Sequence, residues 1–134
     1  MKNLLLILAL LFVSNISLTL SIKEFMDMRD TTGYSEETEI YFSGLMSGSL
    51  VINSMALDKF GDRIFCGPFE RYDPQYHMAL TLRYLKESGP KVAQAWKAEL
   101  GKDFYQEEVS NAYGLMLMTE YLCESTFNEL KKNK

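Results

Sequence analysis

Residues 41–68 read YFSGLMSGSLVINSMALDKFGDRIFCGP. Their first part is rich in serine and glycine, and each glycine inside a helix costs roughly 0.5–1 kcal/mol relative to alanine. Because a helix that tolerates this cost usually lets another backbone approach closely, we expect Gly44 and Gly48 to mark a helix contact within the domain or across a dimer. The apolar residues that recur at helical spacing in this part are Tyr41, Leu45, Ile52, Met55 and Ala56.

Residues 1–21 have the pattern of a secretory signal peptide. Lys2 supplies the positive charge, residues 4–13 form a short apolar run, and Thr19 and Ser21 are the small residues of a cleavage site. The apolar run of about ten residues is shorter than the roughly 20 that a membrane-spanning helix needs. We therefore predict a signal peptide at 1–21, with an uncleaved anchor as the alternative, followed by a single domain at 22–134.

The charge balance is acidic, with 18 Asp and Glu against 14 Lys and Arg. The balance becomes one unit more negative when Lys2 leaves with the signal peptide. Nucleic-acid binding depends on Lys and Arg that neutralise phosphates, so we predict no nucleic-acid partner. The same balance argues against binding to an anionic membrane surface, and it is typical of a soluble surface.

The domain contains two cysteines, Cys66 and Cys123. In an oxidising compartment, an even pair most simply forms one disulfide. This bridge would close a loop of about 58 residues, which the chain-entropy relation converts to roughly 4 kcal/mol. We therefore predict a Cys66–Cys123 disulfide in an exported protein.

Helical signals lie on both sides of the opening stretch, while no alternating strand pattern and no internal repeat is present. Ser35 is placed as the N-cap of the first long helix, and Asp73 followed by Pro74 begins the next. We predict an all-α fold, a small single-domain helical bundle of about four main helices with one disulfide. The predicted helices cover 22–28, 36–57, 74 up to Ser88, 90 up to Gly101, and 106–130.

Catalytic patterns are scarce. An enzymatic alternative would use Cys66 as a thiol nucleophile and His77, the one histidine, as its base, but a bridged sulfur cannot attack. One histidine and two widely separated cysteines match no compact metal-ligand spacing. No phosphate-binding glycine loop or hydrolase motif is present. We therefore predict that the protein is not an enzyme, has no metal site or cofactor, and acts by binding.

Several features follow one another in a distinctive order: the export signal, the helix YFSGLMSGSLVIN, FCGP at 65–68, YL at 84–85 before Gly89 and Pro90, and a second cysteine in a final helix. This order resembles the periplasmic immunity proteins of type VI secretion systems, the kind that neutralise peptidoglycan amidase effectors. The resemblance covers residues 38–124. It departs at Cys123, which has Leu122 and Glu124 as neighbours where such proteins commonly have a proline beside the cysteine.

The resemblance implies an all-α fold, a periplasmic location, a homodimer and no enzymatic activity. It also implies that the protein docks on a cell-wall amidase effector and blocks its substrate cleft, often with an inserted loop. Loops held by a rigid scaffold suit such a role. The first candidate is the loop around Cys66, and the second is the turn at 30–37. The toxin-binding candidates in the first loop are Asp62, Arg63, Phe69, Glu70 and Arg71.

An alternative function from another class is a small periplasmic chaperone or stress protein with no single dedicated partner. Such proteins are also small, helical and singly bridged. A chaperone would bind many clients and change its assembly with pH, whereas an immunity protein would bind one partner tightly.

Overall fold

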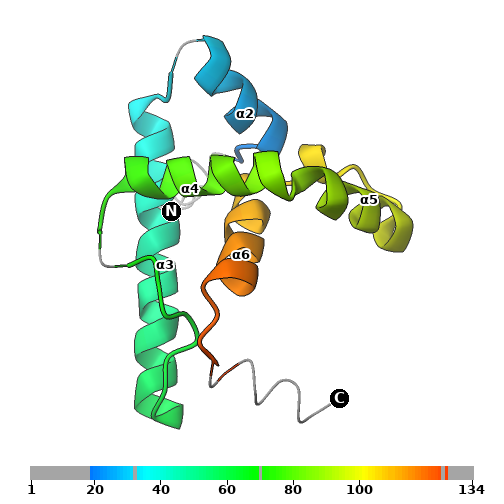
Figure 1. The fold of residues 1–134 in the computed structure, drawn as a ribbon. Coiled ribbons are helices and arrows are strands. Elements are labelled where there is room, and N and C mark those ends of the chain that lie inside the picture. The colour runs from blue at the N-terminus through cyan, green and yellow to red at the C-terminus, as the bar shows by residue number, and fades with distance from the viewer. Residues whose placement is uncertain (1–18, 32, 70, 125, 127–134) are drawn as a thin grey trace, which may run out of the picture.

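The computed structural model describes residues 19–31, 33–69, 71–124 and 126. These residues form five α-helices, one 3₁₀ turn and two isolated β-bridges, without any longer strand. The prediction of a small all-α domain is thereby confirmed. The elements, labelled in Figure 1, are α2 (Ile22–Thr31), α3 (Glu36–Phe60), α4 (Pro74–Glu87), α5 (Gly89–Leu100), η1 (Phe104–Gln106) and α6 (Val109–Glu120).

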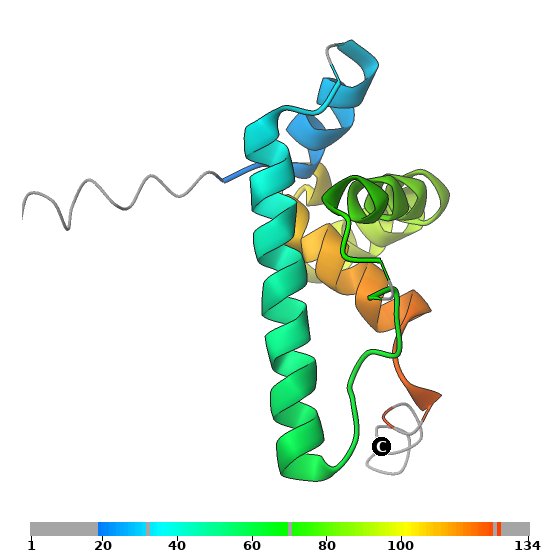
Figure 2. The same cartoon turned by 90° about the vertical axis from the view of Figure 1, so that its left-hand side faces the viewer.

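The longest element, α3, forms one side of the domain, and α4 crosses it and packs against both α3 and α6. Helix α5 continues outward from α4, and η1 returns the chain towards α2. In both ribbon views the C-terminal end of α3 extends beyond the other helices (Figures 1 and 2). The chain then runs back beside α3 to reach α4, which places the loop around Cys66 next to this projecting end.

Local capping explains where the helices begin and end. The Ser35 hydroxyl accepts a hydrogen bond from the backbone N–H of Thr38 at 3.3 Å, as an N-cap does. Helix α3 ends at Phe60, three residues beyond the predicted end at 57. Its C-cap is Gly61, whose φ of +75° lies in the left-handed region that glycine adopts easily. Asp73 caps α4 by accepting from the N–H of Gln75 at 3.0 Å. The predicted beginnings of both helices are confirmed.

The prediction for the last helix is wrong, because α6 ends at Glu120 instead of continuing to 130. Beyond it the backbone pairs with the loop after α3. The N–H of Cys66 donates to the carbonyl of Tyr121 at 2.8 Å, and the N–H of Cys123 donates to the carbonyl of Ile64 at 2.9 Å. These hydrogen bonds need an extended backbone, so they compete with the helix. Residues 127–130 of the predicted helix lie outside the described residues.

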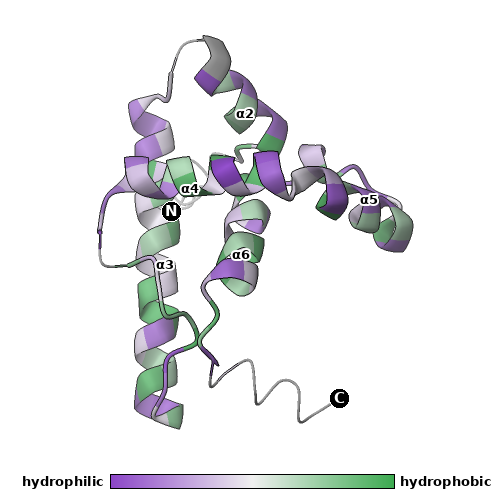
Figure 3. Ribbon diagram, viewed as in Figure 1, coloured by the Kyte–Doolittle hydropathy of each residue, from purple (hydrophilic) through white to green (hydrophobic). Residues whose placement is uncertain are grey.

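The core lies between α2, α3, α4 and α6. Its largest fully buried side chains include Phe25, Phe42, Phe104, Met46, Met78 and Met116. Helix α3 buries Phe42, Met46, Ser49, Asn53 and Ala56, which follow one another at helical spacing. Ile52 and Met55, which the sequence pattern grouped with this face, are instead 48% and 66% exposed. Figure 3 shows that apolar residues also occur on the projecting half of α3.

The described part of the N-terminus is packed against the domain. Leu20 is buried, and its carbonyl accepts from the N–H of Val109 at 2.8 Å. The N–H of Ile22 donates to the carbonyl of Glu107 at 2.9 Å. Residues 1–18 of the predicted signal peptide lie outside the described residues. Cleavage after Ser21 stays a prediction, and it would remove Leu20 from this pairing.

Candidate functional site: a clamped loop at the end of α3

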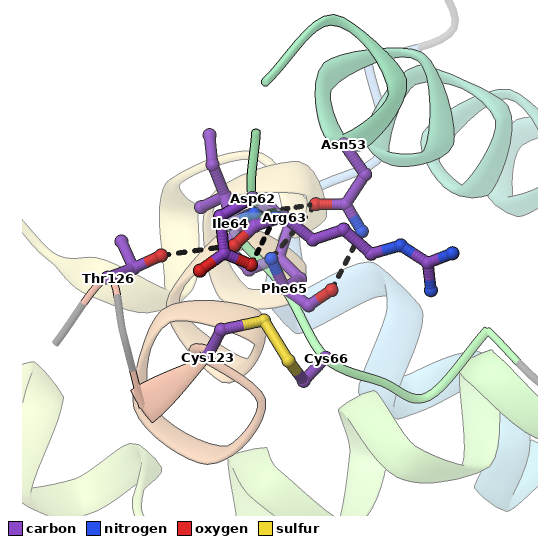
Figure 4. Close-up of a disulfide and its surroundings, with 8 residues drawn as sticks. All are labelled: Asn53, Asp62, Arg63, Ile64, Phe65, Cys66, Cys123 and Thr126. Atoms are coloured by element: carbon purple, nitrogen blue, oxygen red, sulfur yellow. Dashed lines mark hydrogen bonds between the residues drawn. A yellow bond between two sulfur atoms is a disulfide. The ribbon is translucent and has the colours of Figure 1, made fainter. Parts of the chain in front are cut away.

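A disulfide joins the loop after α3 to the segment after α6. Cys66 and Cys123 are bonded, as predicted, with Cα atoms 4.9 Å apart (Figure 4). Cys123 is buried, whereas Cys66 faces solvent. The cysteines are both in this bridge, so Cys66 has no thiol that could act with His77 as a nucleophile.

A second clamp comes from α3, where the side chain of Asn53 points at the loop (Figure 4). Its Nδ2 donates to the carbonyl of Phe65 at 2.8 Å. Its Oδ1 accepts from the N–H of Phe65 at 2.9 Å and from the N–H of Ile64 at 3.2 Å. One buried amide therefore satisfies three backbone groups that would otherwise lack partners. Together Asn53 and the disulfide hold the loop from both sides.

The far end of the loop rests on a buried histidine. The ring of Phe69 stacks on that of His77, with centroids 5.9 Å apart. His77 is fully buried, with Nε2 3.2 Å from the carbonyl of Arg71 and Nδ1 3.0 Å from the hydroxyl of Tyr113. A carbonyl only accepts, so Nε2 carries a proton in that contact, whereas the hydroxyl of Tyr113 can donate to or accept from Nδ1. His77 thus belongs to the core and supports the loop.

The buried position of Tyr113 changes the pKa of its hydroxyl. Burial raises the pKa of Tyr113 to about 12, and a hydrogen bond with Ser49 acts more weakly in the opposite direction. The hydroxyl therefore stays protonated throughout the physiological range, which keeps its contact with His77 intact.

Between α3 and the loop lies a cleft of about 530 Å³. Its walls are mainly apolar, formed by Leu50 and Leu57 from α3 and by Phe65 and Phe69 from the loop. Among its lining residues Arg63 is the charged one. Because both walls are held by the clamps, the cleft is formed in advance of any binding event, which reduces the ordering cost of association.

The predicted toxin-binding residues lie in different surroundings along the loop. Asp62 and Arg63 are exposed at the tip, where the Asp62 carboxylate accepts from the Arg63 N–H at 2.8 Å. Phe69 is half-buried against His77, as described above. Arg71 is exposed beside the start of α4, where it pairs with Asp73 at 3.3 Å and lies over the ring of Tyr76 at 5.0 Å. Glu70 lies outside the described residues.

The second predicted loop, at 30–37, lies at the opposite end of α3 from the Cys66 loop (Figure 1). Tyr34 in this turn stacks on Phe25 of the core, with centroids 5.1 Å apart. The two loops therefore cannot form one continuous binding surface. Residue 32 of this turn is outside the described residues.

Gly44 and Gly48 both face away from the core. A Cβ atom built on either glycine would meet no heavy atom within 4 Å, so the expected close helix contact within the domain is absent at these two positions. They share the outer face of α3 with Ile40 and Val51, which are 64% and 57% exposed. The other alternative from the sequence, a contact across a dimer, stays a prediction.

Sequence reasoning missed Asn53 and His77 as residues that position the loop. The available signal for Asn53 was its spacing, because it follows Phe42, Met46 and Ser49 along one helical face. A polar side chain on a buried face needs partners, and its partners proved to be loop backbone 11 and 12 positions further on.

Within the part of the chain that the structure describes, no group of three or more His, Cys, Asp or Glu residues is placed to hold a metal ion. In the same part, α3 is long and apolar enough to cross a membrane by length and composition, and 28% of its apolar stretch is buried. Core helices of soluble proteins pass the same test when they are mostly buried. Helix α3 packs on α4, and its last turn carries Asp58 and Lys59.

Comparison with known proteins gave no relative: no family model, no curated protein and no solved structure matches the chain.

Proposed function

We propose that the protein is a periplasmic immunity protein that binds a type VI secreted peptidoglycan amidase toxin and blocks its substrate cleft. The clamped loop at the end of α3 is the surface that would do so. This proposal rests on the order of sequence features described above, together with one structural observation: the loop is held on both sides at an end of the domain that projects into solvent. A rigid, protruding, polar-tipped loop suits insertion into an enzyme cleft.

Exposure and packing indicate which part of the loop would enter such a cleft. Asp62 and Arg63 are exposed at the tip, next to the apolar cleft lined by Leu57 and Phe65. Interfaces gain most of their affinity from a few anchors, and arginine is frequent among them. Phe69 and Arg71, by contrast, are occupied in packing against α4 side chains. We therefore assign the leading contact to the tip.

The first test replaces the tip residues. Asp62→Ala combined with Arg63→Ala is expected to weaken binding to the cognate amidase by tenfold or more, because a hot-spot residue typically contributes at least about 1–2 kcal/mol. The measurement is titration calorimetry against purified type VI amidase effectors, paired with release of soluble peptide from peptidoglycan. A matched control, Lys86→Ala with Glu87→Ala, removes one charge of each sign from the exposed far end of α4. Unchanged affinity in the tip variant would exclude the tip from the interface.

We further propose that the protein forms a homodimer through the outer face of α3. Two glycines four positions apart, flanked by the exposed Ile40 and Val51, allow two helices to approach closely. Gly48→Leu is expected to leave the fold intact, because open space surrounds this position. The variant should elute as a monomer where the parent chain elutes as a dimer. A variant that remains dimeric in sedimentation would place the contact elsewhere.

The chaperone alternative is supported by the apolar side chains that α3 exposes at several points along its length. Ile40, Val51, Met55 and Phe60 are all largely exposed, and exposed apolar side chains can bind other chains. Light scattering between pH 7 and pH 3, with an aggregation assay on an unrelated client protein, separates the two functions. Suppressed aggregation without inhibition of any amidase would favour the chaperone.

A further inference from the structure

The projecting end of α3 carries an apolar groove distinct from the cleft described above. Its volume is about 490 Å³, and its walls come from Ile52, Met55, Phe60 and Ile64. The first three side chains are 48%, 66% and 74% exposed. The cleft beside the loop uses other residues of α3, namely those around Asn53. An exposed apolar groove in a small domain often marks a binding site for another segment or chain.

The described chain ends at the edge of this groove. Cys123 donates its N–H to the carbonyl of Ile64 at 2.9 Å, and the Thr126 hydroxyl donates to the carbonyl of Arg63 at 3.1 Å. These two contacts place the last described residue beside a wall of the groove. Glu124 and Thr126 both have helical backbone conformation.

The sequence that follows suits the groove. Residues 127–134 read FNELKKNK, in which the apolar residues Phe127 and Leu130 stand three positions apart. This spacing places both on one side of a helix. Eight residues span about 12 Å as a helix and roughly 27 Å when extended. The segment is therefore long enough to reach along the end of α3.

We propose that the C-terminal segment 127–134 docks in cis on this groove, with Phe127 and Leu130 placed between Met55 and Ile64. The groove also presents Asp58 and Lys59, while the segment carries Glu129 together with Lys131, Lys132 and Lys134. Pairing of Asp58 with one of these lysines would support this occupant.

Tethering favours the segment over a second copy of the chain. Its first residue follows directly on Thr126, so its effective concentration at the groove is in the millimolar range. A second copy would need that concentration in solution to compete. The docked segment would support the Cys66 loop from a third side, and a partner that binds the end of α3 would have to displace it. This inference does not depend on the proposed amidase partner.

The test uses the full domain with methyl-labelled isoleucine and methionine. Phe127→Ser with Leu130→Ser should shift the methyl signals of Ile52, Met55 and Ile64 and should raise the fluorescence of a hydrophobic dye severalfold. The matched control, Asn128→Ser with Asn133→Ser, should leave both unchanged. The signals of the buried Met78 and Met116 report whether the variant remains folded.

Two results would overturn the inference. The first is unchanged groove methyl signals in the Phe127 and Leu130 variant. The second is groove signals that vary with protein concentration in every variant, which would identify a second copy as the occupant. If the tail variant fails to fold, Met55→Ser makes the same test from the groove side. It should speed trypsin cleavage after Lys131, and an unchanged cleavage rate would count against docking.

Discussion

Replacing both cysteines, Cys66→Ala with Cys123→Ala, is expected to lower the free energy of unfolding by about 4 kcal/mol. The bridge joins residues 57 positions apart, so its loss releases a long loop in the unfolded chain. Urea unfolding followed by circular dichroism measures the effect as a lower midpoint. The slope of the transition should rise, because the unlinked chain exposes more surface on unfolding.

The control is the parent protein unfolded in the presence of dithiothreitol, which breaks the bridge without changing a residue. Both samples should unfold at the same urea concentration. A loss below about 1 kcal/mol would contradict the prediction. It would show that the backbone hydrogen bonds of Cys66 with Tyr121 and of Cys123 with Ile64 hold the segments without the disulfide.

Asn53→Leu is expected to cost about 3 kcal/mol, since a leucine of similar size keeps the packing but leaves backbone groups unsatisfied. The N–H and carbonyl of Phe65 belong to a buried residue, and each loses its partner. The N–H of Ile64 also loses its acceptor, but this residue is half-buried, so water can compensate in part. The measurement is urea unfolding together with hydrogen exchange at the amides of Ile64 and Phe65.

Ser54→Ala is the matched control, because Ser54 lines the same cleft from the same helix but is exposed. Its effect should stay within about 0.5 kcal/mol. Slow exchange at Ile64 and Phe65 in the Asn53 variant would show that the disulfide alone holds the loop. Because both clamps act on one loop, combining the two variants should cost less than the sum of their separate effects.

The sequence predicted correctly those features that depend on neighbours along the chain. The N-cap at Ser35 bonds a backbone N–H three residues ahead, and the N-cap at Asp73 bonds one two residues ahead. The disulfide was predictable for another reason, since two cysteines offer one intramolecular pairing. These features sufficed for the all-α class and for the existence of a bridged loop.

The tertiary structure decided what depends on residues far apart in the chain. The end of α6 at Glu120 reflects competition from backbone pairing with Ile64 and Cys66, which no local pattern near residue 120 reveals. The helical face of Asn53 was readable, but its loop partners were not.

Tertiary packing also decided which face of α3 is buried. Apolar residues lie on both its inner and its outer face, so periodicity alone could not distinguish Met46, which is fully buried, from Met55, which is largely exposed. The packing of α4 made that choice, because it covers one face of α3 and leaves Gly44, Gly48 and the projecting end in solvent. Burial depends on where other elements pack, and it is the burial pattern that defines the surfaces available for partners.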